Sequence, residues 1–121
     1  MKERLLLLVV MVVMVSGCVE RTSMYYWENY SNSLYNVKKN GTPEARLEHE
    51  KTLLAIIAKA DAKGVKPPPG VCCELGFHYL GIGKKEEAVK YFEMEQTAFP
   101  ESAQLVAALK KKALATSEET L

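Results

Sequence analysis

The stretch that decides the fold runs from Pro67 to Pro100 and reads PPPGVCCELGFHYLGIGKKEEAVKYFEMEQTAFP. Proline stands at both ends of it, and a proline ring is incompatible with the interior of a helix. In the middle, Gly81 and Gly83 separate two segments of helical character, because glycine favours the tight turn between helices. The stretch therefore predicts one helix–turn–helix repeat, preceded by an extended spacer over Pro67–Gly70.

The spacing of residues within this stretch resembles that of a tetratricopeptide repeat. Gly76 is small where the two helices are expected to approach closely, and Phe92 is large enough to fill the space between them. The sequence departs from the repeat at Cys72, where a large residue is usual, and at Glu95, where a small residue is usual. The positions expected to pack the repeat are Leu75, Gly76, Tyr79, Ala88, Phe92 and Pro100.

A second pair of helices is predicted before the repeat, joined by a short connection that makes them antiparallel neighbours. Thr42-Pro43-Glu44 favours a helix start, with a capping hydroxyl, a proline in the first position and an acid in the first turn. The apolar stripe of the first helix, over residues 25–39, is expected to lie in the core rather than to bind a ligand: Trp27, Tyr30, Leu34 and Val37. The second helix is expected to place His49 on its solvated side and to bury Leu47, Leu53, Leu54, Ile56, Ile57 and Ala60.

The last helix is predicted over residues 101–115, where Leu105, Val106, Leu109 and Ala113 share one side. It is expected to cap the exposed edge of the repeat, and residues 116–121 are expected to form a frayed tail. The predicted fold is therefore all-α. It consists of two antiparallel helix hairpins of tetratricopeptide-like form plus a C-terminal capping helix, in one domain over residues 25–115.

The N-terminus has the pattern of a membrane-targeting signal. A short charged segment precedes Leu5–Val15, an apolar run of eleven residues, which is shorter than the roughly 20 residues that span a bilayer. Val15-Ser16-Gly17-Cys18 comes next and resembles a bacterial lipobox. The resemblance implies that residues 1–17 are a cleaved signal peptide, that Cys18 carries the lipid and that residues 18–24 form a short tether. The alternative is an ordinary secretory signal with a chance cysteine.

The residues after Cys18 bear on where the protein sits. Val19 stands where an aspartate would favour retention in the inner membrane, so the periplasmic face of the outer membrane is predicted. Tyr25 lies within roughly 25 Å of the predicted anchor even in a fully extended chain, and Tyr26 and Trp27 follow it directly. These rings either rest at the level of the lipid headgroups or pack in the core of the domain.

The charge balance argues against a nucleic-acid binder. The chain has 16 basic and 15 acidic residues, and removing Lys2, Arg4 and Glu3 with the signal leaves 14 of each sign. A neutral domain lacks the basic surface that phosphate backbones require.

The sequence contains no convincing catalytic set, so it predicts no enzyme, no cofactor, no metal and no small-molecule substrate. His78 has no serine or aspartate at motif spacing. Cys72 and Cys73 are expected to be small buried residues in the helix packing. A vicinal or intermolecular disulfide is the first alternative, and a metal or redox role with His78 is the second.

From about Tyr25 to Leu109, the chain carries the motifs Tyr26-Trp27-Glu28-Asn29-Tyr30, Leu34-Tyr35, Pro68-Pro69-Gly70, Glu74-Leu75-Gly76 and Phe99-Pro100-Glu101-Ser102. Through these motifs, this part of the chain resembles a family of small bacterial outer-membrane lipoproteins of unknown function. Members of that family are often encoded beside a curli-secretion-type lipoprotein. The resemblance implies a role in the assembly of the cell envelope.

These observations predict a membrane-anchored protein–protein interaction module in a cell-envelope or secretion assembly, with an envelope partner such as a curli-secretion-type lipoprotein. A regulator or activator of a cell-wall enzyme is the alternative, and a metal-binding or redox protein that uses Cys72 and Cys73 is the third. The partner surface is expected where the two hairpins meet, around Tyr35, Pro68, Tyr79 and Glu101.

Overall fold

The computed structural model describes residues 1–15 and 23–115, and these residues are all-α, as predicted. The elements are α1 (Lys2–Val15), α2 (Tyr30–Asn40), α3 (Pro43–Ala62), α4 (Val71–Gly81), α5 (Lys85–Ala98), the 3₁₀ helix η1 (Pro100–Ser102) and α6 (Ala103–Ala115). No strand occurs within the two described ranges. Ser16, Gly17 and Cys18 of the predicted lipobox lie outside the described residues, as does the predicted tail over 116–121.

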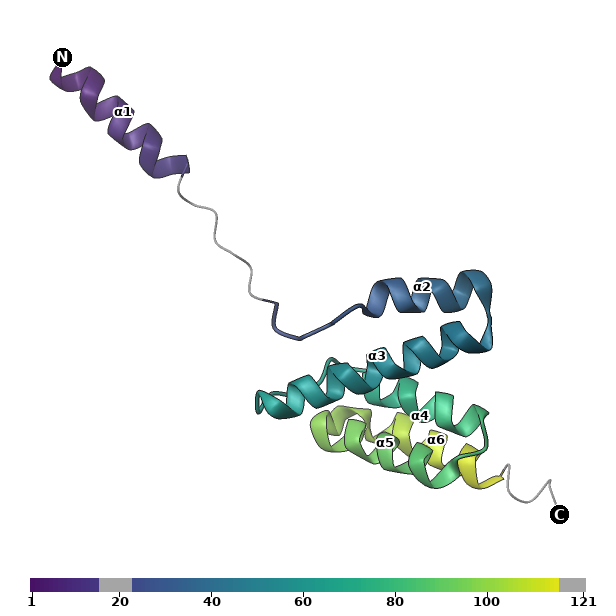
Figure 1. Ribbon diagram of the computed structural model, residues 1–121. Coiled ribbons are helices and arrows are strands. Elements are labelled where there is room, and N and C mark those ends of the chain that lie inside the picture. The colour runs from purple at the N-terminus through teal and green to yellow at the C-terminus, as the bar shows by residue number, and fades with distance from the viewer. Residues whose placement is uncertain (16–22, 116–121) are drawn as a thin grey trace.

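Helices α2 to α6 form one stack in chain order, in which each helix packs against the next. Figure 1 shows α2 on one side of the stack, α5 and α6 on the other, and α1 apart from the stack. Short turns join α2 to α3 and α4 to α5. Because of this order, α4 lies between the first pair of helices and α5.

Helix α3 begins as its sequence predicts. The Thr42 hydroxyl accepts a hydrogen bond from the Ala45 amide at 3.2 Å, and Pro43 occupies the first turn. The helix buries one continuous row of side chains, Ala45, His49, Thr52, Leu53, Ile56 and Ala60. Leu47 is 50 % exposed, so its predicted burial is wrong. Two residues along a helix turn the side chain about 200° away from Ala45, which places Leu47 on the opposite face.

Helix α2 begins at Tyr30, five residues later than predicted. The preceding backbone turns instead of coiling, because Glu28 has a φ of +44° and the Tyr30 amide donates to the Trp27 carbonyl. A non-glycine residue with positive φ interrupts a right-handed helix. The predicted core stripe therefore divides, since Tyr30 packs against the core while Trp27 is 41 % exposed.

Helices α4 and α5 approach each other closely at Gly76. At Gly76, an added Cβ would lie 2.5 Å from Cε1 of Phe92 and 3.1 Å from the Ala88 carbonyl oxygen. Glycine is required there because any side chain would occupy the space of the Phe92 ring. We call this contact the apolar seam, and its members, all buried, are Leu75, Gly76, Ala88 and Phe92.

Helix α6 covers α5 with Val106, Leu109 and Ala113, which are buried. Leu105 is 55 % exposed, so its predicted place on the same side is wrong. One residue turns the side chain by 100°, and the spacing of the buried row leaves Leu105 outside it. Pro100 is exposed and begins η1, which connects α5 to α6.

Glu95, which stands where a small residue is usual in the repeat, has a structural role of its own. Its side chain is buried and accepts hydrogen bonds from the amides of Gly70 at 2.8 Å and Cys73 at 3.4 Å. These amides begin α4, where a helix leaves its first N–H groups without partners inside the helix. A carboxylate is favoured there, because the helix dipole is positive at this end. Glu95 of α5 therefore caps α4.

Candidate functional site

The most elaborate cluster of polar side chains lies where α2, α3 and α4 meet. The Tyr30 hydroxyl donates to Glu74 Oε2 at 2.7 Å, and His49 Nε2 lies 2.9 Å from Glu74 Oε1. On the other side of the imidazole, His49 Nδ1 lies 2.8 Å from the Ser33 hydroxyl. We call these four residues the polar junction. The prediction that His49 is solvated is wrong, because it is buried and both ring nitrogens have partners.

The polar junction contains a serine, a histidine and a glutamate, which are the residue types of a hydrolase triad. Ser33 has no exposed surface, however, so no substrate can reach its hydroxyl. Glu74 contacts Nε2 while Ser33 contacts Nδ1, which reverses the roles that the two nitrogens have in such a triad. The arrangement links three helices and presents no accessible nucleophile.

A second cluster uses the same residue types between α3 and α4. Glu50 Oε2 lies 2.8 Å from His78 Nε2, and Glu50 Oε1 accepts a hydrogen bond from the Tyr79 hydroxyl at 3.1 Å. The tyrosines of these two clusters, Tyr30 and Tyr79, have their pKa values shifted in the same direction. Burial first, and then the hydrogen bond to glutamate, raises the pKa of Tyr30 and of Tyr79 to about 12. Both hydroxyls therefore stay protonated donors under ordinary conditions.

Cys72 and Cys73 are free thiols buried in the packing of α4. Burial, with the Glu95 carboxylate next in importance, raises the pKa of Cys72 to about 12 and that of Cys73 to about 11. A thiol reacts as its thiolate, so neither side chain is activated. No group of three or more potential metal ligands occurs among residues 1–15 and 23–115.

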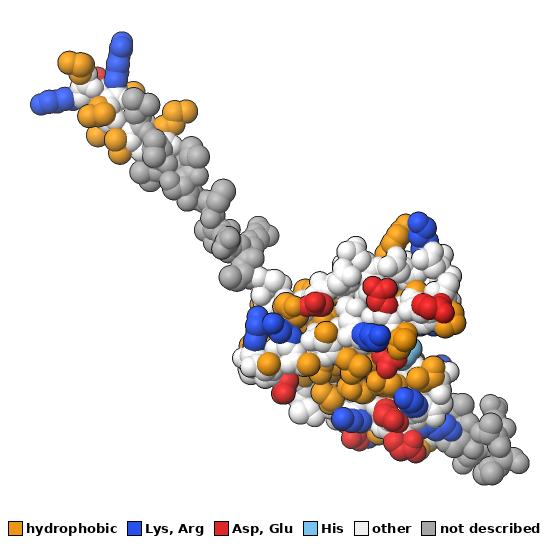
Figure 2. Space-filling view, in the orientation of Figure 1, with side chains coloured by type: hydrophobic (Ala, Val, Ile, Leu, Met, Phe, Trp, Pro, Cys, Tyr) orange, Lys and Arg blue, Asp and Glu red, His pale blue; other side chains and the backbone are white. Residues whose placement is uncertain are grey.

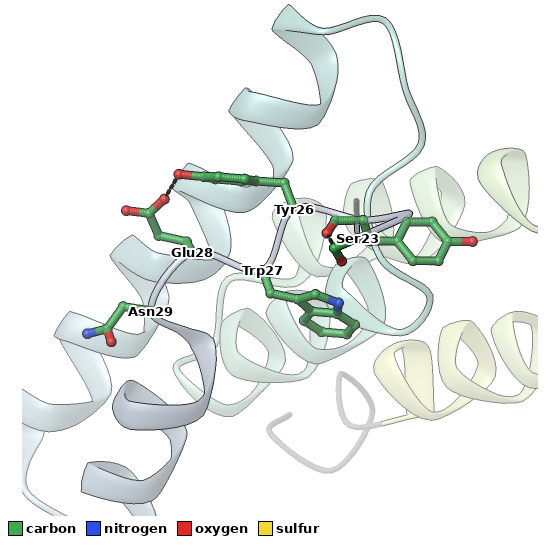
Figure 3. A pocket seen from close by; sticks show the side chains of 6 residues that line it. Ser23, Tyr26, Trp27, Glu28 and Asn29 are labelled. Atoms are coloured by element: carbon green, nitrogen blue, oxygen red, sulfur yellow. Dashed lines mark hydrogen bonds between the residues drawn. The ribbon is translucent and has the colours of Figure 1, made fainter. Parts of the chain in front are cut away.

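Residues 23–29 precede α2 and curve around an open hollow of about 560 Å³, lined by Ser23, Tyr25, Tyr26, Trp27, Glu28 and Asn29. Figure 3 shows the Tyr26 and Trp27 rings leaving the backbone in different directions, with the Tyr26 hydroxyl directed at the Glu28 carboxylate. Tyr25 and Tyr26 are half-buried. We call residues 23–29 the aromatic segment. Of its two predicted environments, the core is wrong for Trp27, whose indole is partly open to solvent.

A second hollow, of about 360 Å³, lies beside α5 and is lined by Pro67, Cys72, Lys90, Glu93, Met94 and Thr97. Met94 is one of its apolar lining residues. Lys90 and Glu93 add one charge of each sign, and Glu93 also binds Lys110 of α6 at 2.6 Å. We call it the α5 groove. Its mixed lining suits a peptide side chain better than a charged small molecule.

The four residues predicted to form a partner surface do not come together. Tyr35 is 61 % exposed on α2, whereas Pro68 and Tyr79 are buried. Glu101 is exposed on η1, at the other side of the stack from α2. The prediction of one surface around them is wrong, because three helices separate the first residue from the last.

The predicted packing positions of the repeat lie as follows. Leu75, Gly76, Tyr79, Ala88 and Phe92 are buried, and Pro100 is exposed between α5 and α6. The polar junction was missed, although His49 stands four residues after Ala45 and four before Leu53, both of which are buried. A polar residue inside an apolar row was the available signal, because a buried imidazole needs polar partners.

Together these features define a class: a small all-α domain of stacked helices, preceded by a separate apolar helix. The chain belongs to the family described as a domain of unknown function (DUF4810), whose model matches residues 24–109. No curated protein and no solved structure shows significant similarity to the chain.

Proposed function

We propose that this protein is a lipid-anchored lipoprotein of the outer membrane and that its helical domain is a protein–protein interaction module in a cell-envelope or secretion assembly. The observation that carries the proposal is the form of the N-terminus. Helix α1 has exposed apolar side chains at Leu5–Leu7 and Val9–Met11, stands apart from the stack and is followed within three residues by Cys18. None of the described helices has the length and apolar character to cross a membrane.

A cleaved signal explains these features together. An apolar helix that packs on no core has no use in the folded domain, but it is what a secretion signal requires. Acylation of Cys18 then replaces it as the membrane attachment, since several acyl chains hold a protein to a bilayer far more firmly than one. The fold of residues 23–115 needs no contribution from α1.

The interaction role is supported by surface that the stack does not use. Apolar side chains are exposed on three helices of the stack, at Leu47 of α3, Phe77 of α4 and Leu105 of α6. The α5 groove adds a concavity with a partly apolar lining. Exposed apolar groups beside concave surface are typical of sites that bind protein segments. The resemblance to envelope lipoproteins suggests a curli-secretion-type lipoprotein as the partner.

Mass spectrometry of the protein purified from bacterial membranes tests the anchor. We expect a chain that begins at Cys18 and carries the added mass of three acyl chains, and we expect Cys18→Ser to abolish both changes. Retention of residues 1–17, or an unmodified Cys18, would contradict the anchor.

Crosslinking in cells tests the interaction role. A photoreactive residue at Met94 reports on the α5 groove, and one at the exposed Lys38 of α2 serves as the control. A secretion-type lipoprotein captured through Met94 but not through Lys38 supports the proposal. Capture of a cell-wall synthase would favour the regulator of a cell-wall enzyme instead.

A further inference from the structure

The aromatic segment is fixed to the C-terminal end of α3 by two lysines. The ammonium groups of Lys59 and Lys63 lie 5.4 and 5.3 Å from the centre of the Tyr26 ring. Trp27 packs edge-on against Tyr30 at 5.3 Å between ring centres, which connects the segment to α2. Cations over an aromatic face are attracted by its negative charge density. The segment and the two lysines therefore form one surface at one end of the stack.

This surface combines apolar groups with positive charge. Met24 is 81 % exposed, Trp27 is partly exposed, and neither belongs to the core. Figure 2 shows Lys and Arg side chains gathered where the described chain resumes after the grey residues. The acidic neighbours are Glu28, which accepts from the Tyr26 hydroxyl, and Asp61 of α3. Amphipathic rings beside lysines are the composition that favours the headgroup region of a bilayer.

The distance along the chain points to the same partner. From Cys18 to Ser23 there are five residue steps, which span at most about 18 Å when fully extended. If Cys18 holds the lipid, this end of the stack must stay within that distance of the membrane surface. A soluble partner would have to enter the narrow space between the domain and the bilayer, whereas lipid headgroups are already there.

We propose that the aromatic segment, with Lys59 and Lys63, is a docking surface for the headgroup region of an anionic phospholipid bilayer. The inference rests on the proposed anchor at Cys18. Trp27 and Met24 lie among the headgroups and upper acyl chains, and the two ammonium groups contact lipid phosphates. The domain is then held in one orientation relative to the bilayer.

Fluorescence of Trp27, the single tryptophan of the chain, tests the docking. The mature lipoprotein is reconstituted in vesicles of phosphatidylethanolamine with phosphatidylglycerol, whose acyl chains carry bromine near the headgroup. Bromine quenches only a nearby indole, so we expect the emission to fall by at least a third relative to unbrominated vesicles. Replacing the phosphatidylglycerol by phosphatidylethanolamine is expected to halve the quenching, because the lysines lose the anionic headgroups.

The variant Lys59→Glu/Lys63→Glu is expected to reduce the quenching at least twofold. Lys38→Glu/Lys39→Glu is the matched control, since Lys39 also lies over a tyrosine ring, that of Tyr35, at 5.7 Å. We expect the control to be quenched like the wild type. If the first variant does not fold, the two vesicle compositions decide the question with the wild-type protein.

Flotation of the same samples separates the two proposals. Protein that floats with the vesicles while Trp27 stays unquenched overturns the docking and leaves the anchor intact. Quenching that is equal in both vesicle compositions overturns the role of Lys59 and Lys63. Protein that does not float, and whose Cys18 carries no lipid, overturns the anchor and the docking together.

Discussion

Helix α4 meets α5 through the apolar seam, and it meets α2 and α3 through the polar junction. In the seam, Gly76 and Phe92 fit by shape. The Glu95 carboxylate also joins α5 to α4, but at the start of α4 and outside the seam. In the junction, His49 is hydrogen-bonded to one oxygen of the Glu74 carboxylate, and the Tyr30 hydroxyl donates a hydrogen bond to the other oxygen. The first contact gains stability from the removal of apolar surface from water. The hydrogen bonds of the second contact must offset the cost of burying polar groups. This contact therefore fixes the relative orientation of the helices more than it adds to the free energy of unfolding.

In this small domain, one contact holds two helices together and the other fixes how three helices are arranged. Dispersion and burial are not directional, so a seam of this kind holds two helices without specifying a third. A histidine with partners on both ring nitrogens requires Ser33 on one side and Glu74 on the other at the same time. That requirement fixes α2, α3 and α4 relative to one another. Four substitutions, in order of decreasing effect, test this division.

Phe92→Ala should have the largest effect. Phe92 is fully buried in the seam, and removing its ring loses the transfer free energy and leaves a cavity. We expect a loss of about 3–5 kcal/mol in the free energy of unfolding. Urea unfolding of the full chain in mild detergent, followed by helical circular dichroism, measures it. Phe77→Ala, whose ring packs on Phe92 at 5.7 Å but is 44 % exposed, is the control and should cost about 1 kcal/mol. Equal losses would contradict the seam.

His49→Ala should come second, at about 2–3 kcal/mol, because it removes two hydrogen bonds and leaves a buried space. The matched variant is His78→Ala, which breaks the corresponding contact with Glu50. The His78 side chain is 22 % exposed against 9 % for His49, so water can replace its bond and about 1 kcal/mol is expected. The same unfolding measurement applies. A smaller loss for His49→Ala than for His78→Ala would show that the junction is not a structural link.

Gly76→Ala should cost up to about 2 kcal/mol. Alanine favours a helix over glycine by about 1 kcal/mol, but its Cβ would meet the Phe92 ring at 2.5 Å, and such overpacking costs about 1–3 kcal/mol. Gly81→Ala tests the propensity by itself, since no heavy atom lies within 4 Å of its Cβ position. It should be neutral or stabilising in thermal unfolding. A stabilised Gly76→Ala protein would mean that the seam has room for a methyl group at Gly76, contrary to the 2.5 Å approach of the Phe92 ring.

Tyr30→Phe should have the smallest effect at neutral pH, about 1 kcal/mol for one hydrogen bond to the carboxylate. The effect of Tyr30→Phe on the free energy of unfolding is easier to detect at alkaline pH. The pKa of Tyr30 is raised from its ordinary 10.0 to about 12, so the folded chain keeps a proton that the unfolded chain releases. The stability tied to this hydroxyl is complete below pH 10 and is lost as the pH rises towards 12.

Spectrophotometric titration of tyrosinate, together with unfolding at several pH values, checks the last prediction. The wild-type protein should lose stability steeply between pH 10 and 12. Tyr30→Phe should lose part of that dependence, and Tyr79→Phe should lose another part. An unchanged profile in both variants would show that neither hydroxyl is held by its glutamate.

The seam was predictable because its signal is local. Small and large residues alternate at fixed intervals within one stretch, and the turn between them is marked by Gly81 and Gly83. The start of α3 was predictable for the same reason, since Thr42 caps an amide only three residues away. The late start of α2 was not, because the apolar spacing from Trp27 continued past the point where the backbone turns.

The sequence by itself determined the all-α class, the beginning of α3 and the residues of the seam, since each depends on neighbours within a few helical turns. Only the tertiary structure decided that His49 meets Glu74, 25 residues away, and that Glu95 caps α4 across the same separation from Gly70. From the sequence alone, a polar side chain is predicted to be solvent-exposed unless its hydrogen-bond partner is known. What identifies the partner is the order in which the helices stack, and that order depends on the whole chain.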